Sequence, residues 1–392
     1  MKFSEWPCYD DEEIEAVVQV LKSGKVNYWT GTHCREFEAE FANFSGTQYA
    51  IAVANGTVAL DLALIACGLG VGDEVIVTSR TYLASVSSIV NAGCTPIFAD
   101  VNPVSQNITA DTISAALTSR TRAIVCVHLA GWPCDMDPIL ALAQEKGLFV
   151  IEDCAQAHGA LYKGRPVGSL GNVACWSFCQ DKIITTGGEG GMVTTNDHAF
   201  WSKMWSYKDH GKSWEAVYKQ NHPPGFRWLH ESFGTNWRMT EIQAVIGLIQ
   251  LRKLPVWQAR RLKYAKQIWS AAEQTNEIEA PRLECTGCFG GCEKSAIGCR
   301  HAAYKCYAFV KSSFVERDEI MAKINDKGVP CFSGSCSEVY LEKAFANTGF
   351  RPKERLPIAK RLGETSLMFL CHPSLQQNEV DRTCEVIQEV AD

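Results

Sequence analysis

Val173-Ala-Cys-Trp-Ser-Phe-Cys-Gln-Asp-Lys182 and Gly187-Gly-Glu-Gly-Gly191 form the most informative segment of the chain. The pattern predicts a strand that runs into a lysine, then a glycine-rich turn and a second strand at 191–195. A lysine held away from solvent between two strands can lose its proton, and Schiff-base formation needs that neutral amine. The glycines allow the backbone to approach a bound ring or phosphate because they have no Cβ atom. Taken alone, the pattern also fits a surface lysine before a turn.

A carboxylate precedes this segment in Ile151-Glu-Asp-Cys-Ala-Gln-Ala-His-Gly159. Asp153 comes just past a predicted apolar strand at 148–152, where parallel α/β sheets place ligand-binding groups. A carboxylate there can keep a pyridine nitrogen protonated, so that a bound pyridoxal phosphate (PLP) acts as an electron sink. The alternative is an aspartate that only caps the next helix. The two segments in tandem favour a PLP site.

An anion site is a third signal, at Asn55-Gly-Thr57, which opens a predicted helix after a strand at 49–53. Backbone amides at a helix N-terminus bind phosphate, and the Thr57 hydroxyl adds a donor. A helix that is merely capped has the same tripeptide pattern. Ser177 would be a second phosphate donor. Tyr82 follows another predicted strand and would either stack on the cofactor ring or belong to the core.

Strands and helical patterns alternate over the first 250 residues. This alternation predicts a mostly parallel sheet with helices on both faces. Further strands are predicted at 73–77, 96–99 and 123–127. Helices are predicted at 58–66, 83–92, 110–117 and 137–145.

The alternating pattern breaks around residues 252–258, which include Pro255. We therefore predict a large domain at 1–255 and a smaller α+β domain at 256–392. In the smaller domain the sequence predicts a helix from 258 to about 274, a strand at 301–310, and helices at 316–327 and 378–390.

Composition restricts the class of protein. The 392 residues are 46% hydrophobic and 21% charged, which is ordinary for a globular chain. The formal net charge of −6 argues against a nucleic-acid binder. No export signal and no apolar run of about 18 residues is visible, so we expect a cytoplasmic protein that is not membrane-bound. Its 18 cysteines are then expected to be reduced.

Several segments, in order along residues 10–255, resemble the DegT/DnrJ/EryC1/StrS family of sugar aminotransferases. They include Gly188-Glu-Gly-Gly191 and Gly234-Thr-Asn-Trp-Arg-Met-Thr-Glu-Ile-Gln243, with the stretches 37–44, 54–60, 72–76, 95–100, 152–159 and 177–182. The C-terminal third is similar only loosely. The resemblance implies fold-type I, the aspartate aminotransferase-like architecture, with a mostly parallel seven-stranded sheet and a smaller C-terminal α+β domain.

The resemblance also implies roles for individual residues. Lys182 would carry PLP as a Schiff base, and Asp153 would pair with the ring nitrogen. Asn236 matches an asparagine that family members present to the phosphate of the neighbouring subunit, which implies a homodimer with shared sites. The other implied cofactor contacts, on the phosphate, the ring face or the phenolic oxygen, are Gly56, Thr57, Ser177, Tyr82 and Gln156.

The reaction implied by the resemblance is transfer of an amino group from L-glutamate to a nucleotide-linked keto sugar, for polysaccharide or secondary-metabolite synthesis. Members that remove a sugar hydroxyl characteristically have histidine in place of the lysine, so Lys182 favours transamination. Asn236-Trp-Arg-Met-Thr240 resembles the variant common in members that act at sugar C4. We therefore expect a 4-keto-6-deoxy sugar as the acceptor.

Cations between residues 207 and 238 are candidates for binding the nucleotide. Their charges suit a pyrophosphate and their aromatic neighbours suit a base, although a solvated loop has the same composition. The candidate substrate contacts are Lys208, His210, Arg227 and Arg238.

A cysteine cluster and two rival functions stay open. Cys285, Cys288, Cys292 and Cys299 contain one tight Cys-x2-Cys pair where zinc sites usually have two, so we expect reduced thiols and no metal. One rival is another fold-type I enzyme, such as a lyase or sulfur-transfer enzyme, with a reactive cysteine. The other is a sensor that binds PLP or sugar without turnover, which the intact Lys182–Asp153 pair disfavours.

Overall fold

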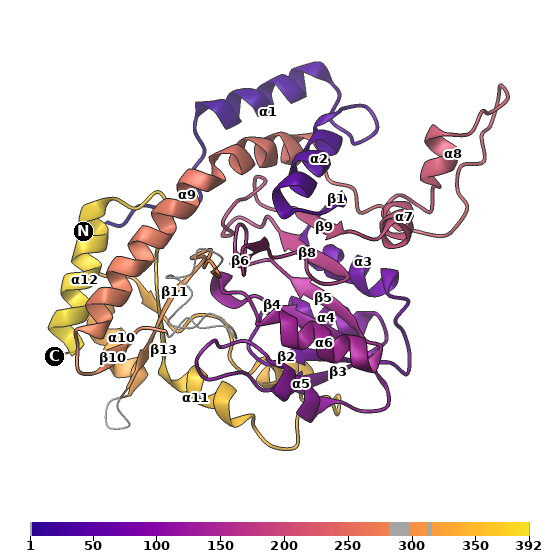
Figure 1. The fold of residues 1–392 in the computed structure, drawn as a ribbon. Helices are drawn as coiled ribbons and strands as arrows, with labels where there is room; N and C mark the ends of the chain where they lie inside the picture. Colours follow the sequence, from indigo (N-terminus) through magenta and orange to yellow (C-terminus); the bar gives the residue numbers. More distant parts are fainter. Residues whose placement is uncertain (1, 282–297, 312–315, 392) are drawn as a thin grey trace.

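The computed structural model describes residues 2–281, 298–311 and 316–391. Its large sheet has seven strands in the order β1-β9-β8-β5-β4-β2-β3. Strand β9 is antiparallel to both β1 and β8, and the other pairs are parallel, which confirms the predicted sheet (Figure 1). The strands are β1 (Tyr49–Val53), β2 (Glu74–Thr78), β3 (Thr95–Ala99), β4 (Thr121–Val127), β5 (Phe149–Asp153), β8 (Val173–Ser177) and β9 (Gly191–Thr195).

Helices cover both faces of this sheet because its strands are apolar on both sides. In β2, Val75 and Val77 belong to the core cluster that includes α3 and α4, whereas Ile76 lies in the cluster on the other face with α5 and α6. Alternate side chains of a strand point to opposite faces, so one apolar strand supplies two cores. The covering helices are α3 (Gly56–Ala66), α4 (Ala84–Asn91), α5 (Ala110–Ala116), α6 (Met136–Lys146) and α7 (His198–Tyr207).

The long helix α9 (Glu241–Glu273) differs from the sequence-based expectation. A break near Pro255 and a separate helix from residue 258 were predicted, but one helix continues through Pro255. Pro255 is exposed, so its ring and its missing N–H face solvent. Residues of α9 up to Leu254 pack in the core of the large sheet, and residues from Tyr264 onward pack in the second core. The division into domains at residue 255 stays a prediction.

A second sheet has four antiparallel strands in the order β10-β11-β13-β12. Helices α10 (Arg317–Asp326) and α12 (Gln377–Ala391) pack in the same core cluster as this sheet. The strand predicted at 301–310 begins only at Cys306, because Ala303 has a φ of 51° that an extended strand cannot contain. The strands are β10 (Ile278–Glu279), β11 (Cys306–Val310), β12 (Cys331–Phe332) and β13 (Ser366–Phe369).

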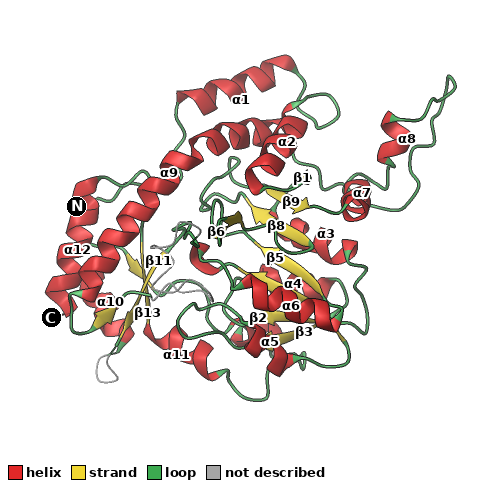
Figure 2. Ribbon diagram, viewed as in Figure 1, coloured by secondary structure: helices red, strands yellow, loops and turns green. Residues whose placement is uncertain are grey.

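The remaining elements surround these two sheets (Figure 2). Helix α8 lies on an arm, residues 208–235, that projects away from the large sheet in Figures 1 and 2. None of the helices in the described ranges has the length and apolar character needed to cross a bilayer. The elements not yet named are α1 (Asp11–Ser23), α2 (His33–Ser45), η1 (Leu129–Gly131), β6 (Leu161–Tyr162), β7 (Arg165–Pro166), α8 (Trp214–Tyr218), η3 (Val339–Leu341), η4 (Lys343–Phe345) and α11 (Pro357–Thr365).

Candidate active site

A cavity of about 670 Å³ is lined by residues at and beyond the carboxyl ends of β1, β2, β5 and β8. Parallel α/β sheets bind ligands at this edge because loops of different strands converge there. Part of the lining comes from the C-terminal region, around residues 304, 334 and 368. The cavity brings together seven residues predicted from the sequence, namely Gly56, Thr57, Tyr82, Asp153, Gln156, Ser177 and Lys182.

Lys182 points into this cavity from the loop after β8. Its side chain is 16% exposed, and its Nζ lies 3.3 Å from the Tyr304 hydroxyl and 3.9 Å from a carboxylate oxygen of Asp181. The backbone carbonyl of Lys182 accepts a hydrogen bond from the Trp6 indole at 2.9 Å. The lysine is therefore held at its backbone, while its amine faces the space that a ligand would fill.

Asp153 is the last residue of β5, whereas the sequence placed it one position past the end of the strand. It is 5% exposed. One carboxylate oxygen accepts a hydrogen bond from the Ser85 hydroxyl at 2.7 Å, and the other accepts one from the Ala155 amide at 3.1 Å. These two donors fix the direction of the carboxylate, as a partner for a ring nitrogen requires.

The start of α3 forms an anion cradle with the end of β8. Gly56 is the first residue of the helix, where backbone N–H groups have no partner within the helix. A Cβ atom on Gly56 would lie 2.6 Å from the Ser177 Cβ, so only glycine permits this approach. Ser177 and Thr57 both line the cavity at this point. Helix amides beside two hydroxyls suit a phosphate.

Tyr82 and Gln156 leave ligand-binding groups available. The Tyr82 side chain is 72% exposed although it lines the cavity, so its ring is free to stack. The Gln156 carbonyl oxygen accepts a hydrogen bond from the Ala130 amide at 2.7 Å, which leaves its NH2 group for a ligand. A lysine, a buried aspartate, an anion cradle and a free aromatic face together fit PLP.

Tyr304, Lys305 and Asp181 complete the surroundings of Lys182, and no role was predicted for them from the sequence. The Tyr304 hydroxyl donates a hydrogen bond to Asp181, and the Lys305 ammonium lies 3.7 Å from the same carboxylate. Burial alone would raise the pKa of Asp181, but the Lys182 ammonium, the Tyr304 hydroxyl and Lys305 lower it below its usual value. The turn at Ala303 that directs Tyr304 and Lys305 toward the cavity was not predicted. The one available signal for these two residues was that they are polar within an otherwise apolar strand pattern.

The two other pKa shifts of this group have the same main cause. Burial raises the pKa of Tyr304 well above its usual value, and the Asp181 charge adds to the effect. Tyr304 is therefore a protonated hydroxyl at neutral pH. Burial lowers the pKa of Lys305, while Asp181 opposes that change.

Lys208 lies in the protein interior, which argues against its predicted contact with substrate. Its side chain is fully buried, and its ammonium donates a hydrogen bond to Glu38 at 3.0 Å. The same ammonium lies 3.9 Å from the centre of the Tyr28 ring. These contacts give Lys208 a structural role, because its charge is already paired away from the cavity.

The other predicted contacts of the arm region do not line the cavity of their own chain. His210, Arg227 and Asn236 are exposed. Arg238 is partly buried and forms an ion pair with Asp209 at 2.7 Å. The cavity of the single chain therefore gives no support to a contact of these residues with substrate or phosphate.

The described cysteines next to the cavity residues give no support to a reactive thiol. Burial raises the pKa of Cys154 well above its usual value, and burial together with Glu189 raises that of Cys179. A nucleophilic cysteine needs the opposite shift. In the predicted cluster, Cys299 is buried and its sulfur accepts a hydrogen bond from the Lys163 amide at 3.4 Å. Its other members, Cys285, Cys288 and Cys292, lie outside the described residues.

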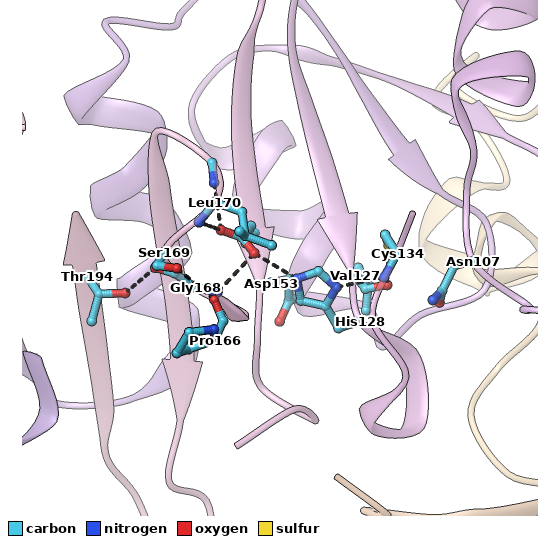
Figure 3. A network of polar contacts seen from close by, with 12 residues as sticks. Asn107, Val127, His128, Cys134, Asp153, Pro166, Gly168, Ser169, Leu170 and Thr194 are labelled. Atoms are coloured by element: carbon cyan, nitrogen blue, oxygen red, sulfur yellow. Dashed lines mark hydrogen bonds and ion pairs between the residues drawn. The ribbon is translucent and has the colours of Figure 1, made fainter. Parts of the chain in front are cut away.

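A second carboxylate on β5, that of Glu152, is not among the residues that line the cavity. Figure 3 shows the network of polar contacts to which His128, Gly168 and Leu170 belong. Glu152 is fully buried and accepts hydrogen bonds from the His128 imidazole at 3.0 Å and from three backbone amides at 2.7–2.9 Å. The other imidazole nitrogen accepts from the Cys134 amide, so His128 donates through Nε2. Burial would raise the pKa of Glu152, but these donors lower it. His128, Glu152 and Cys154 lie close enough to suggest a metal site, but the His128 and Glu152 ligand atoms already have partners.

Comparisons with known proteins identify the family of the chain. Residues 7–388 match the model of the DegT/DnrJ/EryC1/StrS aminotransferase family. GDP-perosamine synthase of Escherichia coli O157:H7 is 36% identical, over 98% of this chain and 96% of its own. The crystal structure of an aminotransferase from Psychrobacter cryohalolentis is 58% identical with a TM-score of 0.95, and covers 99% of this chain and 98% of that one. S. venezuelae DesV is 31% identical with a TM-score of 0.85, covering 97% and 94%.

Proposed function

The chain belongs to the DegT/DnrJ/EryC1/StrS aminotransferase family, and we propose that it transfers the amino group of L-glutamate to C4 of a nucleotide-linked 4-keto-6-deoxy sugar. The protein is a PLP-dependent sugar aminotransferase. The observation that carries the proposal is the cavity in which Lys182, Asp153 and the anion cradle converge. Similarity to a GDP-perosamine synthase and the Arg238-Met-Thr240 sequence support the acceptor class.

The residues of the chain have distinct tasks in this reaction. PLP, when bound, supplies an aldehyde that condenses with amines and a cationic ring that delocalises the electrons left on carbon. We assign the charge on that ring to Asp153, whose direction two hydrogen bonds fix. We assign proton transfer at the donor α-carbon to the Lys182 Nζ. Tyr304 orients that amine, since its own proton is committed to Asp181 and its oxygen can accept an N–H of Lys182.

The same proposal includes a homodimer in which Asn236 acts on the neighbouring site. Asn236 is exposed and does not line the cavity of its own chain. The arm carries Phe226, Trp228 and Phe233 with exposed fractions of 73%, 80% and 98%. Large apolar side chains exposed together favour a protein interface.

Mixing two variants tests the shared site. Lys182→Ala and Asn236→Ala chains, unfolded together and refolded, should form heterodimers with one intact site, and activity should return. If Asn236 acts within its own chain, every site of the heterodimer carries a defect and activity stays absent.

A cytoplasmic location is part of the proposal. The described cysteines are free thiols, as expected where the environment is reducing.

A two-step assay tests the reaction. Purified holoenzyme is mixed with L-glutamate while the visible spectrum is followed, and 2-oxoglutarate is measured. The aminated enzyme is then offered nucleotide-linked 4-keto and 3-keto sugars, and the products are identified by mass spectrometry and NMR. Failure to convert with L-glutamate would reject the donor, and preference for 3-keto sugars would reject amination at C4. Release of sulfide or alanine from cysteine would favour the lyase alternative, and binding without conversion would favour a sensor.

A further inference from the structure

The cavity contains an ammonium group that the reaction described above does not use. Lys305 lines the cavity, and 24% of its side chain is exposed. Its one ion pair within the described ranges is with Asp181, at 3.7 Å, which is too long for a hydrogen bond. The ammonium also lies 4.6 Å from the centre of the Tyr304 ring. Its N–H donors are therefore available to a ligand.

Backbone contacts hold Lys305 in this place. Ala303 has a φ of 51°, and this turn directs the chain into the cavity before β11 begins. The amides of Tyr304 and Lys305 donate to the Ala130 carbonyl at 3.0 and 3.5 Å. The Ala130 amide in turn donates to Gln156, at 2.7 Å. The backbone of Lys305 is thus linked to Gln156, which also lines the cavity, through a short chain of hydrogen bonds.

The charges around the cavity determine what Lys305 can bind. Among the described lining residues the only cations are Lys182 and Lys305, and the anions are Asp153, Asp181 and Glu189. Lys182 is occupied by its role at the cofactor. An amino acid that donates its nitrogen here carries a carboxylate that loses water on entry, and a buried carboxylate needs a cation and hydrogen-bond donors.

We propose that Lys305 forms an oxyanion subsite that binds a carboxylate of the amino donor. The inference rests on the proposed function. The ammonium groups of Lys182 and Lys305 lie on the two oxygens of one carboxylate, Asp181, at 3.9 and 3.7 Å. The amine of the donor must reach the position of Lys182 Nζ, and its α-carboxylate is only two bonds from that nitrogen. Lys305 therefore lies on the side of the reacting nitrogen where a carboxylate can meet a cation.

The hydrogen bond between Tyr304 and Asp181 leaves the Lys305 ammonium available to a ligand. The Tyr304 hydroxyl donates to Asp181, so the aspartate has a closer partner than Lys305. An incoming carboxylate can then approach Lys305 at normal hydrogen-bond length without breaking a direct Lys305–Asp181 hydrogen bond. The subsite is thus the Lys305 ammonium, which lies near Asp181 but can form a short hydrogen bond with a bound carboxylate.

Ligand binding to holoenzyme tests the subsite without turnover. Glutarate, a dicarboxylate that lacks the amine, is titrated by calorimetry into wild type, Lys305→Met and Lys305→Arg. GDP and UDP are titrated in parallel, since a diphosphate is the other oxyanion of the reaction. Lys311→Met serves as the matched control, because Lys311 follows the same strand but donates to the Thr275 carbonyl outside the cavity.

We expect Lys305→Met to weaken glutarate binding by about 10- to 100-fold. The concentration of L-glutamate that half-saturates the first half-reaction should rise by a similar factor. Nucleotide binding should stay within about twofold, Lys305→Arg should recover part of the loss, and Lys311→Met should match wild type. Unchanged glutarate binding, no measurable wild-type binding, selective loss of the nucleotide, or equal loss of both ligands would each overturn the subsite. A wild type that binds glutarate but does not convert with L-glutamate would instead reject the proposed donor.

Discussion

The floor of the cavity and its C-terminal wall are built in different ways. The floor consists of groups at the ends of parallel strands, such as Gly56, Asp153 and Ser177, and each sits in a short local motif. The wall consists of Tyr304 and Lys305, together with residues around 334 and 368, which come from an irregular segment and the second sheet. The comparison suggests that the floor supplies the chemistry and that the wall orients the reacting groups. Three substitutions in the cavity test this division, and a fourth, at Glu152, tests a carboxylate that does not line the cavity.

Lys182→Ala, on the floor, should have the largest effect. Without the amine neither the covalent link nor proton transfer is possible, so turnover should fall by at least about 10³-fold. The visible absorbance of the linked cofactor should be lost as well. Reduction with borohydride followed by peptide mapping should label Lys182 in wild type and nothing in the variant. A label on another lysine would remove the basis of the floor assignment.

Asp153→Asn should come second, with turnover reduced about 10²- to 10³-fold and cofactor still bound. The amide keeps the shape of the side chain but cannot hold a ring nitrogen positively charged. Rates of the L-glutamate half-reaction and cofactor content measured together would separate the two effects. Turnover near the wild-type value would contradict the role of Asp153.

Tyr304→Phe tests the wall and should reduce turnover less, by about 5- to 20-fold. The KM for L-glutamate should change little, and the kinetic isotope effect with α-deuterated glutamate should increase, because a poorly oriented Lys182 makes proton transfer slower. Tyr340→Phe is the control, since that hydroxyl bonds Glu338 outside the cavity. An effect on KM alone, or an equal effect in the control, would mean that Tyr304 has no orienting role.

Glu152→Gln should leave the chemistry nearly intact but reduce stability by about 2–3 kcal/mol, because a buried charged acceptor with four donors is lost. The folded-state pKa of Glu152 is below the ordinary 4.5, so its stabilisation is full above that pH and is lost as pH falls through the folded pKa. Wild-type stability should therefore decline on acidification more steeply than that of the variant, in denaturant titrations at pH 3 to 7. A parallel decline would show that the ionisation of Glu152 does not contribute to the pH dependence of stability.

Most of the floor could be predicted because its signals are local. A strand followed by Asn55-Gly-Thr57, and another followed by Lys182 and glycines, indicates both the element and the group that it presents. The wall could not be predicted, because the pattern at 301–310 favours a plain strand and the φ of Ala303 has no signature in the sequence. The same limit explains why the break predicted near Pro255 was wrong, since helix continuity there depends on which side of α9 faces solvent.

Side-chain partners were also beyond the reach of the sequence. Lys208 appeared among exposed loop cations, yet the fold buries it against Glu38 and Tyr28. Glu152 and Asp153 are neighbours with the same functional group, and only the two faces of β5 separate an anchoring carboxylate from one that lines the cavity.

The sequence by itself determined the alternating α/β architecture and singled out Lys182, Asp153 and the anion cradle as candidate cofactor contacts. These depend on hydrophobic periodicity and on turn residues within a few positions of each other. Only the tertiary structure decided that Tyr304 and Lys305 lie beside Lys182, because Lys182 precedes them by more than 100 positions in the chain. Contacts between distant segments follow from how two sheets pack against one another, and no local pattern encodes that packing.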